Sequence, residues 1–163
     1  MRVALCVMAL ALTTACGGAG GSTASSSVVQ SVNVVAASPD RSFEGMLNAV
    51  RAVNGADPVS YNALLYSAAK GHADDMFAQG YLDHVSLDGR ELDDRVNATG
   101  YEWRRLGENI GQGQSDEEEI LLGWVNSPGH QSNNIHPDFE EFGLAKAGSG
   151  ANQYWVLVLA DPL

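Results

Sequence analysis

Hydrophobic positions follow a helical period in the first half of the chain. Four apolar residues have the spacing i, i+3, i+4 and i+7, which places them on one helical face: Phe43, Met46, Leu47 and Val50. This helix ends at Asn54-Gly55, a helix-stop signal. The same period continues over residues 61–79, and Gly80 provides a C-terminal cap. The pattern predicts two amphipathic helices, of which the second is the longer.

Two further predicted helices are shorter. The segment 91–99 has an apolar pair at positions i and i+4. Ser115 and Glu118 form the S-x-x-E pattern of a capping box with Ser115 as the N-cap, and the acidic first turn complements the helix dipole. We therefore assign the acidic run at 117–119 to the start of a helix and not to a metal site.

Strand signals concentrate near the C-terminus. Residues 142–147 and 154–160 predict two strands joined by a turn rich in Gly and Asn. Both alternating faces of 154–160 are apolar, so we expect this strand in the middle of a sheet that is covered on both sides. Residues 103–110 predict a further strand, although Arg104 and Arg105 interrupt its apolar character. These elements predict a sheet between two helix layers.

The first sixteen residues have the composition of a secretory signal. Arg2 provides a positive charge, residues 3–12 are apolar, and small residues lead into Cys16. We expect a lipoprotein-type signal that ends at Cys16, with lipid attached to this cysteine; conventional cleavage near Ala15 is the alternative. Either route predicts an extracytoplasmic protein, held in the cell envelope or secreted.

The leader is followed by a tether and one domain. Residues 17–39 begin with a Gly/Ser tract, and within them we expect 28–38 to be spacer, with an edge strand as the alternative. Residues 40–163 suffice for one domain with a core but not for two. Cys6 and Cys16 both lie in the leader, which leaves the domain without a disulfide, a cysteine nucleophile or a thiolate metal site.

The charge of the chain is strongly negative. It carries 9 Lys and Arg against 20 Asp and Glu, a formal net charge of −11. This composition disfavours nucleic acid as a partner and causes repulsion from an anionic membrane surface. Because no segment approaches the roughly 20 apolar residues of a membrane span, we expect membrane association only through a lipid on Cys16. We expect the domain to be monomeric.

Three polar residues stand in segments otherwise built of turn and packing residues: His84, Glu108 and His130. His84 precedes a Leu-Asp-Gly turn, and His130 follows a Pro-Gly break that can direct its side chain across a cleft. Glu108 lies in a stretch expected to be partly buried, where a carboxylate needs a partner such as an imidazole N–H. Each residue alone also has a purely structural interpretation. Together they predict one shared cavity.

The chemistry available to this cavity is that of two imidazoles and a carboxylate. Neutral imidazoles are suitable Zn²⁺ ligands, so His84 and His130 are the candidate metal ligands. Glu108 could fix a histidine tautomer or polarise a bound water, which makes it the candidate catalytic residue. His72 and His136 are assigned instead to hydrogen bonding at the core edge and to a turn. No G-x-S-x-G, H-E-x-x-H, P-loop or G-x-G-x-x-G motif occurs.

Taken in order, the motifs resemble the CAP superfamily, also called the SCP-like domain, and its bacterial branch in particular. The resemblance runs from about residue 43 to residue 160. It is carried by His72-Ala73-Asp74-Asp75-Met76, Asp83-His84 with Asp88-Gly89, Gly107-Glu108-Asn109-Ile110, and Trp124-Val125-Asn126-Ser127-Pro128-Gly129-His130 with the following Asn134-Ile135 and Pro137-Asp138-Phe139. It implies an α+β fold, a three-layer α-β-α sandwich with a mostly antiparallel central sheet.

The resemblance also implies a cavity lined by two histidines and two acidic residues, through whose histidines some family members bind a divalent metal. By position these residues are His84, His130 and Glu108, with Asn109 and Ser127 in support. The second acid is absent because Ser127 stands in its region. The first hypothesis is therefore a non-enzymatic binding module for a lipid, a cell-wall component or a protein. The alternative is a zinc-dependent hydrolase or peptidase that uses His84, His130 and Glu108.

Overall fold

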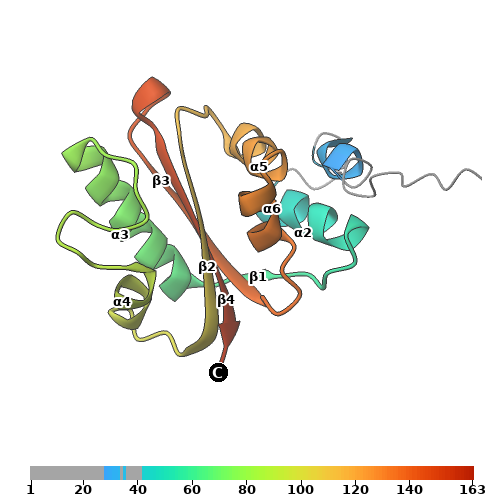
Figure 1. The fold of residues 1–163 in the computed structure, drawn as a ribbon, viewed down its shortest axis with the longest axis horizontal. Helices are drawn as coiled ribbons and strands as arrows, with labels where there is room; N and C mark the ends of the chain where they lie inside the picture. The colour runs from blue at the N-terminus through green and yellow to red at the C-terminus, as the bar shows by residue number, and fades with distance from the viewer. Residues whose placement is uncertain (1–27, 34, 36–41) are drawn as a thin grey trace, which may run out of the picture.

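The computed structural model describes residues 28–33, 35 and 42–163 (Figure 1). The elements are, in order, α2 (Phe43–Val53), β1 (Ser60–Tyr61), α3 (Ala63–Gln79), α4 (Leu92–Asn97), β2 (Trp103–Gln112), α5 (Glu117–Val125), α6 (Pro128–Asn134), β3 (Glu141–Ala147), the 3-10 turn η1 (Gly150–Asn152) and β4 (Tyr154–Pro162). The leader with Cys6 and Cys16 lies outside the described residues. Within the described part, no helix has the length and apolar character needed to cross a membrane.

The sheet has the order β1-β3-β4-β2, with β4 antiparallel to both of its neighbours and β1 parallel to β3. Alternate residues of β4 point to opposite faces. Trp155, Leu157 and Leu159 pack with α2 and α5, whereas Val156, Val158 and Ala160 pack with α3. Figure 1 shows α3 and α4 on one side of the sheet and α2, α5 and α6 on the other. The expected three-layer α-β-α fold and its central strand are confirmed.

The segment before α2 differs from the sequence-based expectation. Residues 28–33 are helical, so neither spacer nor edge strand describes them. Ser31 and Val35 are fully buried, and Asn54 Nδ2 donates a hydrogen bond to Ser31 Oγ at 2.8 Å. Val32 and Val35, three residues apart, pack against the α2 core. Polar residues interrupt this short apolar face in the sequence, so its helical period was not recognised from the sequence.

Two helix starts are displaced from their predicted positions. The N-cap of α5 is Asp116, whose side chain accepts a hydrogen bond from Glu119 N, while Glu119 Oε2 accepts one from Ser115 N at 2.8 Å. The predicted capping box with Ser115 as N-cap and Glu118 as its partner is therefore shifted by one residue. The acidic run does form the first turn of the helix. Helix α3 begins two residues later than expected because residues 60–61 pair with β3.

Strand β2 lies at one end of the sheet and directs successive side chains to different helix layers. Glu108 is opposite Val158, on the face covered by α3, and Asn109 is opposite Leu157, on the face covered by α2 and α5. A Cβ on Gly107 would lie 2.8 Å from the ring of Phe139, so glycine permits the close approach of the segment after α6. Two of the predicted site residues, Glu108 and Asn109, therefore lie on the end strand of the sheet.

Candidate functional site

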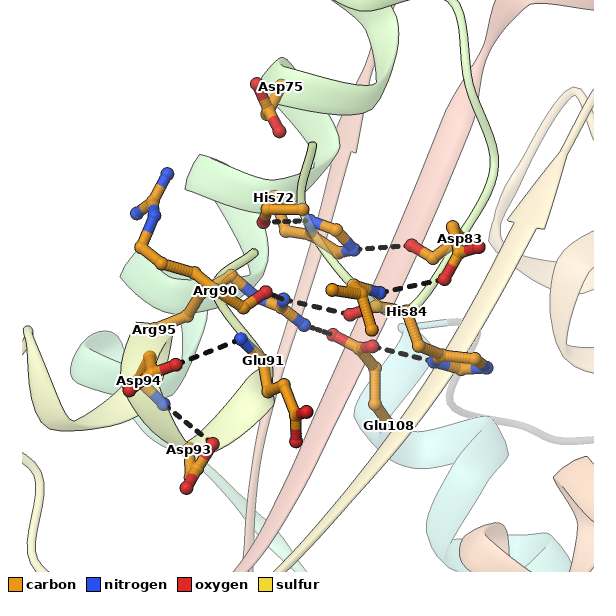
Figure 2. Close-up of polar contacts among 12 residues, drawn as sticks. His72, Asp75, Asp83, His84, Arg90, Glu91, Asp93, Asp94, Arg95 and Glu108 are labelled. Atoms are coloured by element: carbon orange, nitrogen blue, oxygen red, sulfur yellow. Dashed lines mark hydrogen bonds and ion pairs between the residues drawn. The ribbon is translucent and has the colours of Figure 1, made fainter. Parts of the chain in front are cut away.

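Glu108 lies at the centre of a polar cluster formed by β2, α4 and the loop after α3 (Figure 2). Its Oε1 accepts a hydrogen bond from His84 Nδ1 at 2.8 Å, and its Oε2 accepts one from Arg95 Nη2 at 2.6 Å. The Glu108 side chain is only 3% exposed. Both carboxylate oxygens are thus partnered inside the protein, as a buried charge requires. The structure brings His84 and Glu108 together and adds Arg95 to them.

Arg95 fixes both the carboxylate and the loop that carries His84. Its Nη1 donates hydrogen bonds to the carbonyl oxygens of His84, at 2.9 Å, and Arg90, at 3.1 Å. The helix that carries it, α4, begins with a reciprocal capping box between Glu91 and Asp94. One buried guanidinium therefore connects three segments of the chain.

His72 holds the same loop from α3. It is fully buried, its Nε2 lies 2.8 Å from the carbonyl oxygen of Asp83, and its Nδ1 lies 3.4 Å from Ser86 Oγ. Because a carbonyl oxygen only accepts, Nε2 carries the proton and Nδ1 accepts from the serine hydroxyl. Burial lowers the pKa of His72, which favours this neutral form. His72 is a hydrogen-bonding residue at the core edge, as the sequence indicated, and it positions the backbone beside His84.

His130 lies in the first turn of α6 and not in a loop, because a proline at the first helical position starts a helix there. Side-chain amides connect this helix to β2. Asn109 Nδ2 donates to the carbonyl oxygen of His130 at 3.1 Å and to Asn134 Oδ1 at 2.9 Å. Asn133 Nδ2 donates to the carbonyl oxygen of Glu108 at 3.0 Å. The backbones of His130 and Glu108 are thereby held by one amide network.

Helix α6 is fixed at both of its ends. Ser127 is the N-cap residue, and its carbonyl oxygen accepts a hydrogen bond from Gln131 N at 2.8 Å, although its side chain makes no capping bond. At the other end, the fully buried Arg51 donates from Nη1 to the carbonyl oxygens of Asn134 and His136. Ser127 thus contributes to the site through the backbone of α6, and no hydrogen bond within the described residues joins it to the other predicted site residues.

The two imidazoles of the candidate site have opposite pKa shifts. The hydrogen bond to Glu108 raises the pKa of His84 above its ordinary value of 6.5. Burial lowers the pKa of His130, and the charge of His84 lowers it further. In the described ranges, no group of three or more His, Cys, Asp or Glu side chains is arranged to hold a metal ion.

The arrangement leaves Nε2 of His84 for a ligand. The imidazole is 55% exposed, and its Nδ1 is already directed at Glu108. A carboxylate bound to one ring nitrogen fixes the tautomer and orients the other. Nε2 therefore accepts a hydrogen bond or binds a metal when the ring is neutral, and donates when the ring is protonated.

Arg95 is the site residue that the sequence analysis missed. The apolar pair in its segment identified a helix face, but nothing local assigned a role to the arginine. The usable signal was indirect: a carboxylate in a buried stretch has two oxygens to satisfy, and an imidazole N–H satisfies only one.

Replacing Arg95 with Met should lower the free energy of unfolding by about 3–5 kcal/mol, because Glu108 would stay buried without its cationic partner. Denaturant unfolding measures this loss. The matched control is Arg104→Met, where the arginine is 58% exposed and its ion pair contributes at most about 1 kcal/mol. The double variant Arg95→Met/Glu108→Gln should recover part of the loss. Equal stabilities of Arg95→Met and Arg104→Met would contradict the assignment.

An NMR titration should place the pKa of His84 above 6.5 and that of His130 below it. The raised pKa means that the stabilisation from His84 is complete below its unfolded pKa and is lost as pH rises through its folded pKa. The lowered pKa of His130 has the opposite effect, since stability falls as acid forces a proton onto the partly buried ring. Glu108→Gln should lower the pKa of His84, whereas an unchanged pKa of His84 in that variant would show that Glu108 is not the cause.

A family model for the cysteine-rich secretory protein family, CAP, matches residues 45–159. The uncharacterized protein YkwD of Bacillus subtilis (strain 168) is 32% identical over 106 residues, which are 65% of this chain and 41% of that protein. The uncharacterized membrane protein YlbC of the same bacterium is 28% identical over 99 residues, 61% of this chain and 29% of that protein. The chain thus spans less than half the length of these curated relatives.

Solved structures share the fold. An extracellular protein containing an SCP domain from Bacillus anthracis superposes with a TM-score of 0.66 at 24% identity, over 72% of this chain and 38% of that one. An outer surface protein from Borrelia burgdorferi gives 0.68 at 17% identity, over 74% and 90% of the two chains. The family model, which covers most of the chain, and the common architecture agree with the motifs of the sequence. The chain belongs to the cysteine-rich secretory protein, or CAP, family.

Proposed function

We propose that this chain is an extracytoplasmic CAP-domain binding module without enzymatic activity. The observation that carries the proposal is the engagement of Glu108 by His84 and Arg95. A general base must reach the proton that it removes, directly or through a water. A carboxyl side chain that is 3% exposed, with both oxygens occupied, is poorly placed for that role. The half-exposed His84 ring beside it is suited to recognition.

The surroundings of His84 favour a ligand that is partly apolar. Three aliphatic side chains of the same loop are exposed: Leu82 at 46%, Val85 at 41% and Leu87 at 67%. They flank an imidazole that can donate or accept a hydrogen bond. The net charge of −11 disfavours a polyanion. A lipid, a cell-wall component or an apolar segment of a protein fits this combination.

We also place the domain outside the cytoplasm, as a monomer attached by a lipid on Cys16 or secreted after cleavage near Ala15. The apolar leader and its terminal cysteine support this location. The similar Bacillus anthracis protein is described as extracellular, and the Borrelia protein as an outer surface protein.

The test is retention of defined ligands by the mature chain. Neutral lipid vesicles, purified cell-wall fragments and envelope proteins are titrated separately, and bound material is recovered for mass spectrometry. We expect saturable binding of a ligand that is recovered chemically intact. His84→Ala should weaken binding at least about tenfold, or 1.4 kcal/mol, and the matched control His136→Ala, in the turn after α6, should not. Recovery of cleaved ligand, or no retention in any of the three panels, would contradict the proposal.

A second candidate function is zinc-dependent hydrolysis. It is favoured by the hydrogen bond between His84 Nδ1 and Glu108, because zinc-bound histidines usually donate their other ring N–H to such a partner. His84 Nε2 and His130 would hold the ion, which when bound acts as a Lewis acid. Catalytic zinc sites usually have three protein ligands. Two imidazoles do not complete such a centre, so we expect weak binding.

Calorimetric titration with Zn²⁺ distinguishes these possibilities. The mature chain should bind zinc weakly and lose it on dialysis, and either His84→Ala or His130→Ala should abolish the binding signal. His136→Ala serves again as the control that retains it. Zinc retained at one ion per chain after dialysis would favour the hydrolase over the binding module.

A further inference from the structure

The two edges of the sheet differ in how their backbone groups are used. At the β2 edge, side chains bind the outward carbonyl oxygens. Asn133 Nδ2 donates to that of Glu108 and Trp124 Nε1 to that of Ile110, both at 3.0 Å. Other parts of the chain thus occupy this edge, as natural sheets commonly arrange.

The opposite edge is covered only in part. Strand β1 pairs with β3 at Glu141 and Phe142, and the chain then leaves the sheet at Asn62, the N-cap of α3. Residues 143–147 of β3 therefore have no strand beside them in the described structure. We call these five residues the free edge.

Backbone groups of Leu144 and Lys146 point outward from the free edge. The carbonyl oxygen of Phe142 accepts a hydrogen bond from Asn62 N at 2.8 Å, so Phe142 faces β1. Successive strand residues direct their N–H and C=O groups to alternate sides, which gives Leu144 and Lys146 the direction of Phe142. On this side, neither residue has a backbone hydrogen bond to any described residue. Such a row of donors and acceptors is a template for another strand.

Helix α3 runs beneath the free edge and has an exposed aromatic ring near each end of it. A Cβ on Gly143 would overlap the backbone of Tyr66, and one on Gly148 would lie 2.7 Å from the ring of Phe77. Eleven helical residues rise about 16 Å and five strand residues span about 17 Å, so these contacts have matching spacings. Tyr66 is 37% and Phe77 48% exposed. This side of the free edge offers apolar contacts.

The other side of the free edge is hollow and acidic. A depression of about 200 Å³ is lined by residues that include Glu117, Lys146 and Trp155. A second depression, of about 400 Å³, shares Glu117 and Lys146 and adds Asp116 and Glu118. The Lys146 ammonium group lies over the Trp155 ring. Carboxylates outnumber this one amine, so the surface attracts basic side chains.

We propose that the free edge binds an extended segment of another protein as an added strand. Its apolar residues face α3 and alternate with basic residues that face Glu117. The backbone groups of Leu144 and Lys146 supply the hydrogen bonds, the mode by which exposed sheet edges bind peptides. A second copy of this chain is disfavoured, because each copy has a net charge of −11 and brings the same carboxylates. The free edge and the β2 strand of the proposed ligand site lie on opposite sides of the sheet, so the two sites are independent.

A capped seven-residue peptide that alternates valine with arginine tests the proposal. It is titrated into the mature chain while backbone amide signals are followed by NMR. Saturable shifts are expected at Leu144 and Lys146. Absence of saturation would overturn the proposal.

Two N-methylated forms of the peptide test for strand pairing. Every second N–H of an added strand points to its neighbour. Methylating one set of residues, arginines or valines, should therefore abolish the shifts, and methylating the other set should not. Loss with methylated arginines indicates an antiparallel strand, and loss with methylated valines a parallel one. Loss with both forms, or with neither, would overturn the proposal.

Variants of the chain check the location. Lys146→Pro removes an outward N–H, which an edge strand tolerates, and should abolish binding. Lys146→Ala keeps that N–H and should bind at least as tightly as the unmodified chain. Glu117→Gln should weaken binding about threefold, whereas Glu102→Gln, at an exposed residue before β2, should not. Equal binding by the two Lys146 variants would contradict the proposal, and the methylated peptides decide it if the proline variant does not fold.

Discussion

The need to partner one buried carboxylate organises this side of the molecule. Glu108 lies on a strand at the end of the sheet, where no further strand covers it in the described structure, and its charge is removed from water. Arg95 and His84 satisfy it from two other segments. Helix α4 has only six residues and would not be stable alone. Its position therefore depends on the ion pair as well as on Val96, which it buries in the α3 core.

The opposite face of the same strand uses neutral chemistry. Asn109 follows Glu108 directly and points to the other helix layer, where it meets Asn133 and Asn134. On one face the Glu108 carboxylate pairs with a cation, and on the other the Asn109 amide bonds to other amides. These two adjacent residues therefore have chemically different partners. The two candidate histidines thus approach the edge of β2 from different layers. His84 comes with the α3 layer and His130 with the α6 layer.

The sequence predicted the layers of the fold because apolar periodicity reflects packing on a sheet. The fully apolar segment at 154–160 is central, and the helical faces beginning at Phe43 and Leu65 are buried. Boundaries were less predictable. Asp116 and Ser115 are both good caps, and only the tertiary position of the chain decides between them. The two-residue strand β1 exists because it meets β3, which no local pattern records.

The candidate site was predictable only where a single side chain by itself requires a hydrogen-bond partner. A buried Glu108 requires donors, which led to His84 but not to Arg95. Pro128 starts the helix that carries His130, but the position of α6 against the sheet depends on Arg51 and Asn109, residues distant in the chain. Arg51 and Asn109 donate there to backbone carbonyl oxygens, as Arg95 Nη1 does to those of His84 and Arg90. Since every residue has such an oxygen, the sequence does not distinguish the ones that are used.

The packing of Ser31 and Val35 beneath α2 sets how far the domain can stand from an anchor. Only 11 residues separate Cys16 from Val28, whereas 23 separate Cys16 from Asp40. Fully extended, the shorter segment spans about 40 Å and the longer one about 85 Å. With a lipid on Cys16, the domain would work in a layer only a few nanometres deep above the bilayer. A partner anchored in the same membrane would lie within this distance, whereas a more distant ligand would have to diffuse to the domain.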